Sequence, residues 1–143
     1  MLSNYDPGHY DSTCVSPLQA ARDLLGSRLV GYAQGCGIDG NDTSGIAAAV
    51  ALAKSADVAV VFVGLTPNND PTNSGTPPVY SNGDAMEGEG HDRTEITLQG
   101  QQENLVKQVL AANPKTVVVL IHGGALAIPW TKQNVPAILD AVR

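Results

Sequence analysis

Two continuous apolar runs, at 58–63 and 116–121, dominate the hydrophobic pattern of the chain. Both are rich in β-branched residues, and polar positions do not interrupt them. Such runs predict strands that are buried on both faces, as in a parallel sheet. A shorter run at 29–33 predicts another strand, and the apolar segment at 137–142 fits either a strand or a helix.

Helical patterns lie between these runs. Ser16-Pro17 predicts a helix start, because Ser is a good N-cap and Pro suits the first helical position. Apolar residues at helical spacing follow, and Gly26 is a natural end. An Ala-rich segment predicts a second helix at 45–55, for which residues 42–44 offer caps.

A third helix is predicted at 98–113, and Asn113-Pro114 ends it. Its buried stripe is expected to contain Gln101, Leu105, Val109 and Leu110. The resulting alternation of helices and strands predicts an α/β layered sandwich with a mostly parallel sheet. Ligands of such sheets bind beyond the carboxyl ends of the strands. Gly64 and His122-Gly123-Gly124 follow two strands, so they should share one rim with the long polar loop at 66–93.

Composition narrows the choice of partners. The net charge is −6 and no basic run is present, so neither nucleic acid nor an anionic membrane is expected as a partner. The longest apolar stretches are about eight residues, against the ~20 needed to span a bilayer. Residues 1–11 contain no signal peptide. Charged residues make up only 15%, and the polar surface that Ser, Thr, Asn, Gln and Gly must then supply is common in secreted proteins.

The two cysteines, Cys14 and Cys36, are too few for a disulfide framework and lack the CxxC spacing of zinc sites. One disulfide between them and two free thiols are equally open. In a secreted chain the bond would close a loop of about 22 residues and contribute roughly 3 kcal/mol. Cα atoms more than ~7 Å apart would exclude it. Asn41-Asp42-Thr43 is a glycosylation sequon that matters only in the same compartment.

The densest chemical cluster is Glu87-Gly88-Glu89-Gly90-His91-Asp92-Arg93. Glycosidic cleavage needs a carboxylic acid that protonates the leaving oxygen, and glycine lets the backbone approach a substrate closely. On pattern alone a solvated acidic surface loop is the commoner origin of such a cluster, and His91 is more often structural than catalytic. The Glu-x-Glu-x-His order has no strong cation spacing, so neither a metal nor a cofactor is expected.

The same cluster resembles the acid/base loop of glycoside hydrolase family three, which includes β-glucosidases and β-xylosidases. In that family the loop follows a strand ending in Val-Gly-Leu, here Val63-Gly64-Leu65. The resemblance extends over nearly the whole chain, through Asn4-Tyr5, Ser16-Pro17-Leu18-Gln19, Tyr32-Ala33-Gln34-Gly35-Cys36, Gly100-Gln101-Gln102, 117–120, Gly123-Gly124, Trp130 and Val135-Pro136-Ala137-Ile138-Leu139. The order and spacing of these motifs together are specific.

The resemblance implies a retaining mechanism shared between two domains. A barrel domain supplies an aspartate nucleophile, and a six-stranded α/β sandwich supplies the acid/base glutamate. Carried over to this sequence, Glu89 is the acid/base residue, with Glu87 as the alternative. Asp92 and Arg93 resemble the pair that anchors the loop, through a salt bridge or bonds from Arg to carbonyl groups. The resemblance implies neither a metal nor a cofactor.

Three further residues are candidates for the substrate rim, namely His91, His122 and Trp130. For Trp130, packing beside the double-glycine turn is favoured over stacking on a sugar. For His122, a local hydrogen bond is favoured over a substrate contact. Residues 67–86 look like an insertion into the family loop, where they would reshape substrate access.

The implied protein is an exo-acting β-glycosidase for terminal β-linked glucosides or xylosides. Residues 1–143 are then a partial C-terminal domain, incomplete at both ends, whose partners are a glycoside or oligosaccharide and the absent barrel domain. An extracellular or secretory location is expected for the parent protein. Two alternatives stay open: a non-catalytic carbohydrate-binding remnant and a flavodoxin-like nucleotide-binding module. The second is weakened because a P-loop lysine is absent from the sequence.

Overall fold

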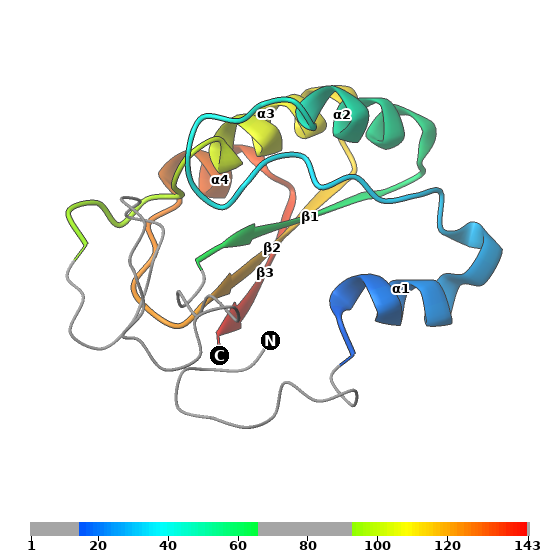
Figure 1. The fold of residues 1–143 in the computed structure, drawn as a ribbon, viewed down its shortest axis with the longest axis horizontal. Coiled ribbons are helices and arrows are strands. Elements are labelled where there is room, and N and C mark those ends of the chain that lie inside the picture. Colours follow the sequence, from blue (N-terminus) through cyan, green and yellow to red (C-terminus); the bar gives the residue numbers. More distant parts are fainter. Residues whose placement is uncertain (1–14, 66–92, 143) are drawn as a thin grey trace, which may run out of the picture.

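The computed structural model describes residues 15–65 and 93–142 (Figure 1). The predicted loop at 66–93 lies almost wholly outside these ranges. In chain order the elements are α1 (Pro17–Leu25), a 3-10 turn (Gly26–Arg28), α2 (Ile46–Ser55), β1 (Ala59–Gly64), α3 (Gln102–Ala112), β2 (Thr116–His122), α4 (Pro129–Asn134) and β3 (Ala137–Val142).

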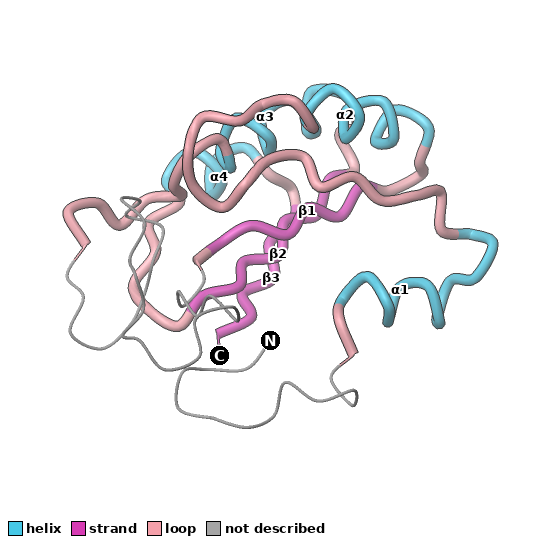
Figure 2. The backbone as a smooth tube through the Cα atoms, in the orientation of Figure 1, coloured by secondary structure: helices cyan, strands magenta, loops and turns pink. Residues whose placement is uncertain are grey.

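The three strands form a parallel sheet in the order β1-β2-β3. Figures 1 and 2 show α2, α3 and α4 together on one side of this sheet, whereas α1 lies apart from them. The connection from β1 to β2 contains α3, and the connection from β2 to β3 contains α4. The predicted α/β layered class with a parallel sheet is therefore confirmed, and the segment at 137–142 is a strand.

The core lies between the sheet and α3. Alternate residues of β1 and β2 are buried here, and so are one stripe of α3 and two residues of α2; the main members are Val61, Val63, Val118, Leu120, Leu105, Val106, Val109, Ile46 and Ala53. Asn113 links this layer to the preceding helix, because its amide Nδ2 donates to the carbonyl oxygens of Ala53 and Ala56. Burial of this apolar surface is the main stabilising contribution of the described fold.

The opposite face of the sheet is apolar as well, but it is open. Val60 and Phe62 of β1 and Leu139 of β3 are 52%, 46% and 60% exposed. The prediction that the run at 58–63 is buried on both faces is therefore wrong for the described residues, since β1 alternates between buried and exposed positions up to Phe62. The reason is that the helices against the sheet lie on one side only (Figure 2).

Two other expectations are corrected by the structure, and one helix was not expected. Residues 29–33 form no strand; Val30 and Tyr32 are exposed, and Gly31 runs close to the side chain of Leu52 in α2. The third helix begins at Gln102 rather than at residue 98, because Gly100 adopts a positive φ in the turn before it. The short helix α4 was not predicted at all, although Pro129 stands at its start.

The caps of the first two helices follow the sequence to different degrees. The hydroxyl of Ser16 accepts a bond from the Gln19 N–H, so the predicted N-cap of α1 is confirmed. Before α2, the Asp42 carboxylate accepts from the Ser44 N–H, yet the N-cap position itself is Gly45 and makes no side-chain bond. No helix in the described ranges is long and apolar enough to cross a membrane.

The core predicts a clear contrast between two leucines. Leu105 is 6% exposed and Leu24 in α1 is 79% exposed. We expect Leu105→Ala to lower the free energy of unfolding by about 2–5 kcal/mol, because it removes buried methyl groups and leaves a cavity. Leu24→Ala, the matched control, should change it by no more than about 0.5 kcal/mol. Urea denaturation of both variants measures the difference, and equal losses would contradict the assignment of the core.

Candidate active site

The candidate site lies at the carboxyl edge of the sheet, where β1 and β2 end side by side. Gly64, the last residue of β1, is paired with Ile121, and His122 ends β2 one residue later. The prediction that Gly64 and His122-Gly123-Gly124 share one rim is therefore confirmed for the strand ends themselves. This edge is where ligands of parallel sheets bind.

The chain leaves β1 at this edge through a position where only glycine fits. Gly64 has a φ of 146°, and a Cβ added to it would lie 2.0 Å from the carbonyl oxygen of Ile121. Leu65 is buried, and its N–H donates to the same carbonyl oxygen at 2.9 Å. The chain therefore leaves β1 while it is still bonded to β2.

Gln102, at the start of α3, holds this departure point from the helix side. Its Oε1 accepts from the Gly64 N–H at 2.7 Å, and its Nε2 donates to the Gly64 carbonyl oxygen at 2.9 Å. The same Nε2 also donates to the carbonyl oxygen of Ile38 at 2.7 Å. Since Gln102 is only 3% exposed, these bonds satisfy polar groups that water does not reach.

Sequence reasoning missed Gln102 and placed the polar member of the buried stripe at Gln101, which is only partly buried. The buried positions of α3 are Gln102, Leu105, Val106 and Val109. These stand at spacings of three, four and seven, so a stripe drawn through Leu105 and Val109 includes Gln102 and leaves Gln101 out. The signal that could have revealed Gln102 is the presence of a glutamine at an otherwise apolar position of the helix.

The described chain resumes beside the turn that follows β2. The Nη2 of Arg93 donates to the carbonyl oxygen of Ala125, and the Ala127 N–H donates to the carbonyl oxygen of Ile96 at 2.6 Å. Thr97 and Ala127 form a parallel bridge. Leu65 and Arg93, the residues on either side of 66–92, are thus bonded to residues 121 and 125, which lie close together in the chain.

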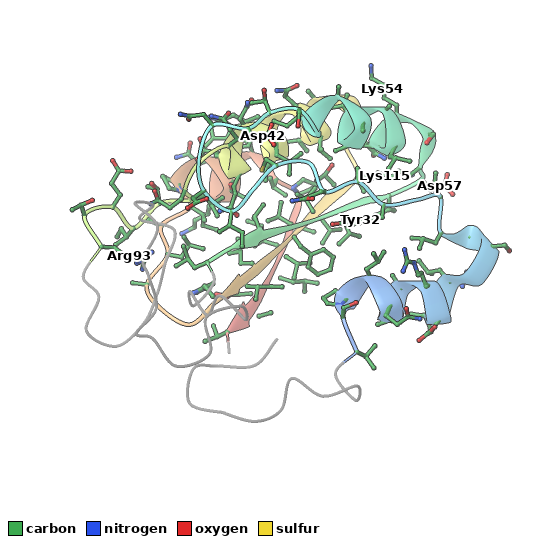
Figure 3. The ribbon with its side chains drawn as sticks, in the orientation of Figure 1. Tyr32, Asp42, Lys54, Asp57, Arg93 and Lys115 are labelled. Atoms are coloured by element: carbon green, nitrogen blue, oxygen red, sulfur yellow. The ribbon has the colours of Figure 1, made fainter. Side chains whose placement is uncertain are left out.

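Arg93 is the part of the predicted anchoring pair that the structure describes. Its bond to Ala125 is of the Arg-to-carbonyl kind, and its Nη1 is buried without a hydrogen-bond partner in the part of the chain that the structure describes. Figure 3 shows Arg93 at the opposite end of the molecule from Asp57 and Lys115, which mark the amino ends of β1 and β2. Glu87, Glu89, His91 and Asp92 lie outside the described residues, and their predicted roles stay predictions.

His122 contacts two acceptors. Its Nδ1 lies 2.7 Å from the carbonyl oxygen of Gly124, and its Nε2 lies 2.8 Å from Oδ1 of Asp140 on β3. The favoured local hydrogen bond is therefore present, and the contact with Asp140 was not predicted. Both ring nitrogens are occupied within the protein, so His122 contributes to the architecture of the rim.

Trp130 lies in the first turn of α4 and packs against the core cluster. The Nζ of Lys107 lies 4.9 Å from the centroid of its ring, within the range of a cation–π contact. Lys107 also pairs with Glu103 one helical turn earlier, at 2.5 Å. One face of the indole is thus covered by a neighbouring helix, which supports the packing role over stacking on a sugar.

Cys36 lies in the loop that Gln102 binds, and it forms no disulfide bond within the part of the chain that the structure describes. Burial raises the pKa of this thiol, and the nearby Asp42 carboxylate raises it further. The Ser44 N–H, in turn, holds the pKa of Asp42 below its ordinary value. A raised pKa disfavours the thiolate, so Cys36 is not an activated nucleophile. Cys14 lies outside the described residues, and the disulfide between the two stays a prediction.

No group of three or more His, Cys, Asp and Glu side chains in the described ranges is arranged to hold a metal ion. What the structure does provide is a parallel α/β layer whose carboxyl edge fixes both flanks of one long acidic segment. This defines a class of protein, a parallel α/β domain, and in such domains ligands bind beyond the carboxyl ends of the strands.

The chain belongs to the family described as glycosyl hydrolase family 3 C-terminal domain, whose model matches residues 2–143. It is 31% identical over 127 residues to a β-xylosidase of Formosa agariphila, which covers 88% of this chain and 15% of that protein. It is 39% identical over 95 residues to β-glucosidase B of Emericella nidulans, which covers 65% of this chain and 9% of that protein.

The chain is also similar to solved structures of β-glucosidases. A β-glucosidase of Erythrobacter marinus matches with a TM-score of 0.62 and 32% identity over 90% of this chain and 19% of that one. A β-glucosidase of Kluyveromyces marxianus in complex with glucose matches with a TM-score of 0.53 and 30% identity over 70% of this chain and 10% of that one. The chain thus spans less than a fifth of the length of these relatives.

The bonds of Gln102 generate a prediction about stability. Gln102→Ala leaves the Gly64 N–H and two carbonyl oxygens without their partner, and a buried unsatisfied polar group costs about 1–3 kcal/mol. We expect the free energy of unfolding to fall by more than about 2 kcal/mol and the Gly64 amide to lose protection from hydrogen exchange. Gln108→Ala, on the exposed face of the same helix, is the control and should be nearly neutral. Equal effects would show that Gln102 is dispensable.

Proposed function

We propose that this chain is part of a retaining, exo-acting β-glycosidase that hydrolyses terminal β-linked glucosides or xylosides, and that it supplies the acid/base segment. One observation carries the proposal most directly. Leu65 and Arg93 flank the segment with Glu87 and Glu89, and both are bonded to the end of β2 or the turn after it. This mounting supports a role in which one carboxyl group must be presented repeatedly at one place.

The proposed chemistry assigns Glu89 two successive steps. As an acid it protonates the glycosidic oxygen while an aspartate of a barrel domain attacks the anomeric carbon and forms a covalent glycosyl-enzyme. As a base it then takes a proton from the water that hydrolyses this intermediate. In retaining enzymes the two carboxyl groups are ~5–5.5 Å apart, so the segment has to lie against the barrel domain. Gly88 and Gly90 give the backbone the freedom for that approach.

Two statements about the parent protein belong to this proposal. Its partners are a glycoside or oligosaccharide substrate and the barrel domain, and the names of the β-xylosidase and the β-glucosidase to which the chain is similar support the glycoside substrate. An extracellular or secretory location is supported by the low share of charged residues and by the sequon at Asn41, which is exposed. The exposed sequon could carry a glycan without displacing the core.

The isolated chain is predicted to have no glycosidase activity. A retaining enzyme needs both carboxylates, and the proposed nucleophile belongs to another domain. The purified 143-residue chain should release nitrophenol from nitrophenyl β-glucoside and β-xyloside at the rate of buffer alone. Clear turnover would contradict the proposed division of the active site between two domains.

Glu89 is predicted to be the acid/base residue of the full-length enzyme. Removing a general acid typically lowers the rate by ~10²–10⁴, and the loss should be largest for substrates with poor leaving groups. In Glu89→Ala an activated aryl glycoside should still form the glycosyl-enzyme, and added azide should restore turnover because it attacks without a base. Measurement of kcat with and without azide, on activated and unactivated substrates, tests both steps.

Two matched variants serve as controls. Glu95→Ala removes an exposed glutamate just after the segment and should leave kcat on both the activated and the unactivated substrate unchanged. Glu87→Ala should also behave nearly normally. Azide rescue in Glu87→Ala alone would move the assignment by two residues. If neither variant responds to azide, the acid lies outside this segment and the proposed function is wrong, and a non-catalytic carbohydrate-binding role becomes the better description.

A further inference from the structure

His122 lies between the strand β3 and the turn that follows β2. It is the last residue of β2, and its side chain is 11% exposed. Asp140 lies on the neighbouring strand β3 and pairs in register with Leu120 of β2, so His122 reaches it diagonally across the sheet. The other side of the ring faces Gly124, two residues further along the chain. One side chain thus connects β3 to the turn that follows β2.

The chemistry of the two contacts restricts how the protons are arranged. A carbonyl oxygen can only accept, so the Nδ1 of His122 donates a hydrogen to Gly124. At the other nitrogen, a carboxylate oxygen 2.8 Å away is also an acceptor. The second contact is a hydrogen bond when a hydrogen lies between Nε2 and Oδ1 of Asp140.

The turn that receives this bond also receives Arg93. Gly124 and Ala125 present successive carbonyl oxygens, of which the first accepts from His122 and the second accepts from Arg93. Ala125 itself is exposed, so burial contributes little to holding it in place. A movement of Gly124 away from His122 would carry with it the acceptor of Arg93.

We propose that His122 and Asp140 are positioning residues. They hold the turn 123–125 where the carbonyl oxygen of Ala125 can accept a hydrogen bond from Arg93. They thereby fix Arg93, the residue that directly follows the segment with Glu87 and Glu89. The inference rests on the proposed function for its catalytic consequence, whereas the placement of Arg93 can be tested without it. Neither residue touches substrate in this proposal. Their effect reaches the acid/base residue through the turn and Arg93.

Tryptic cleavage of the 143-residue chain measures the placement of Arg93 directly. Residues 66–92 contain no Lys or Arg, so cleavage after Arg93 is a distinct event, and cleavage after Lys54 in α2 reports opening of the core. We expect His122→Ala and Asp140→Ala to raise the rate after Arg93 by about 3- to 10-fold, the effect of one lost hydrogen bond, with the rate after Lys54 unchanged. Asp57→Asn, which removes a carboxylate at the opposite edge, is the control.

Asp140→Asn is the informative conservative variant. The asparagine Nδ2 can donate to the Nε2 of the imidazole, so the connection survives without the carboxylate. Cleavage after Arg93 should stay within about twofold of the unaltered chain, a loss smaller than that of one hydrogen bond. Cleavage after Arg93 in Asp140→Asn at the raised rate of Asp140→Ala would overturn the proposed connection.

Activity of the full-length enzyme tests the catalytic consequence. On a glycoside with a poor leaving group, His122→Ala should lower kcat by about tenfold with little change in KM, because a displaced acid is still present but poorly aligned. The single variant Asp140→Asn should keep most of the kcat of the unaltered enzyme. Equal rises in cleavage after Lys54 and Arg93, or an unchanged kcat in His122→Ala, would overturn the positioning role. Failure of the proposed function would appear separately, as the absence of azide rescue in the Glu89 and Glu87 variants.

Discussion

The close approach of β1 and β2 at Gly64 is the constraint on which the rest of the candidate site depends. A side chain at this position would collide with the backbone of Ile121, so the two strands can end together only if residue 64 is glycine. Because a glycine has no side chain to pack, another group must hold its backbone. Gln102 does so by bonding both the N–H and the carbonyl oxygen of Gly64, which fixes the start of α3 against the end of β1.

The sheet itself shows how local composition and tertiary structure can disagree. The residues that face away from α2–α4, such as Val60, Phe62, Val119 and Leu139, are all apolar. Strands of this composition are typical of parallel sheets covered on both faces. Within the residues that the structure describes, helices cover one face only, and β1 is therefore half-exposed. The apolar run predicted the strand and its parallel partner correctly, but the neighbours that decide exposure are not encoded in the run.

The same distinction separates what the sequence could predict from what it could not. The helix α1 was predicted to the residue because Ser16, Pro17 and Gly26 are local signals. The segment at 29–33 was misread because an apolar run becomes a strand only when a neighbouring strand accepts its hydrogen bonds. The rim was predictable from the strand ends. The contact between His122 and Asp140 was not, because it joins residues 18 positions apart and depends on the register of β2 with β3.

The anchors at Leu65 and Arg93, on either side of the segment 66–92, set a low energetic cost on the length of that segment. The bonds at Leu65 and Arg93 are made to backbone carbonyl groups of residues 121 and 125, and they do not depend on the residues between. The entropy of closing a loop grows only with the logarithm of its length, about 0.6 kcal/mol for each doubling. Additional residues between the two anchors therefore add little to the cost of closure as long as both anchors persist. The sheet edge, Gln102 and the turn after β2 hold Leu65 and Arg93 in place, and none of these bonds involves a side chain from the residues between them.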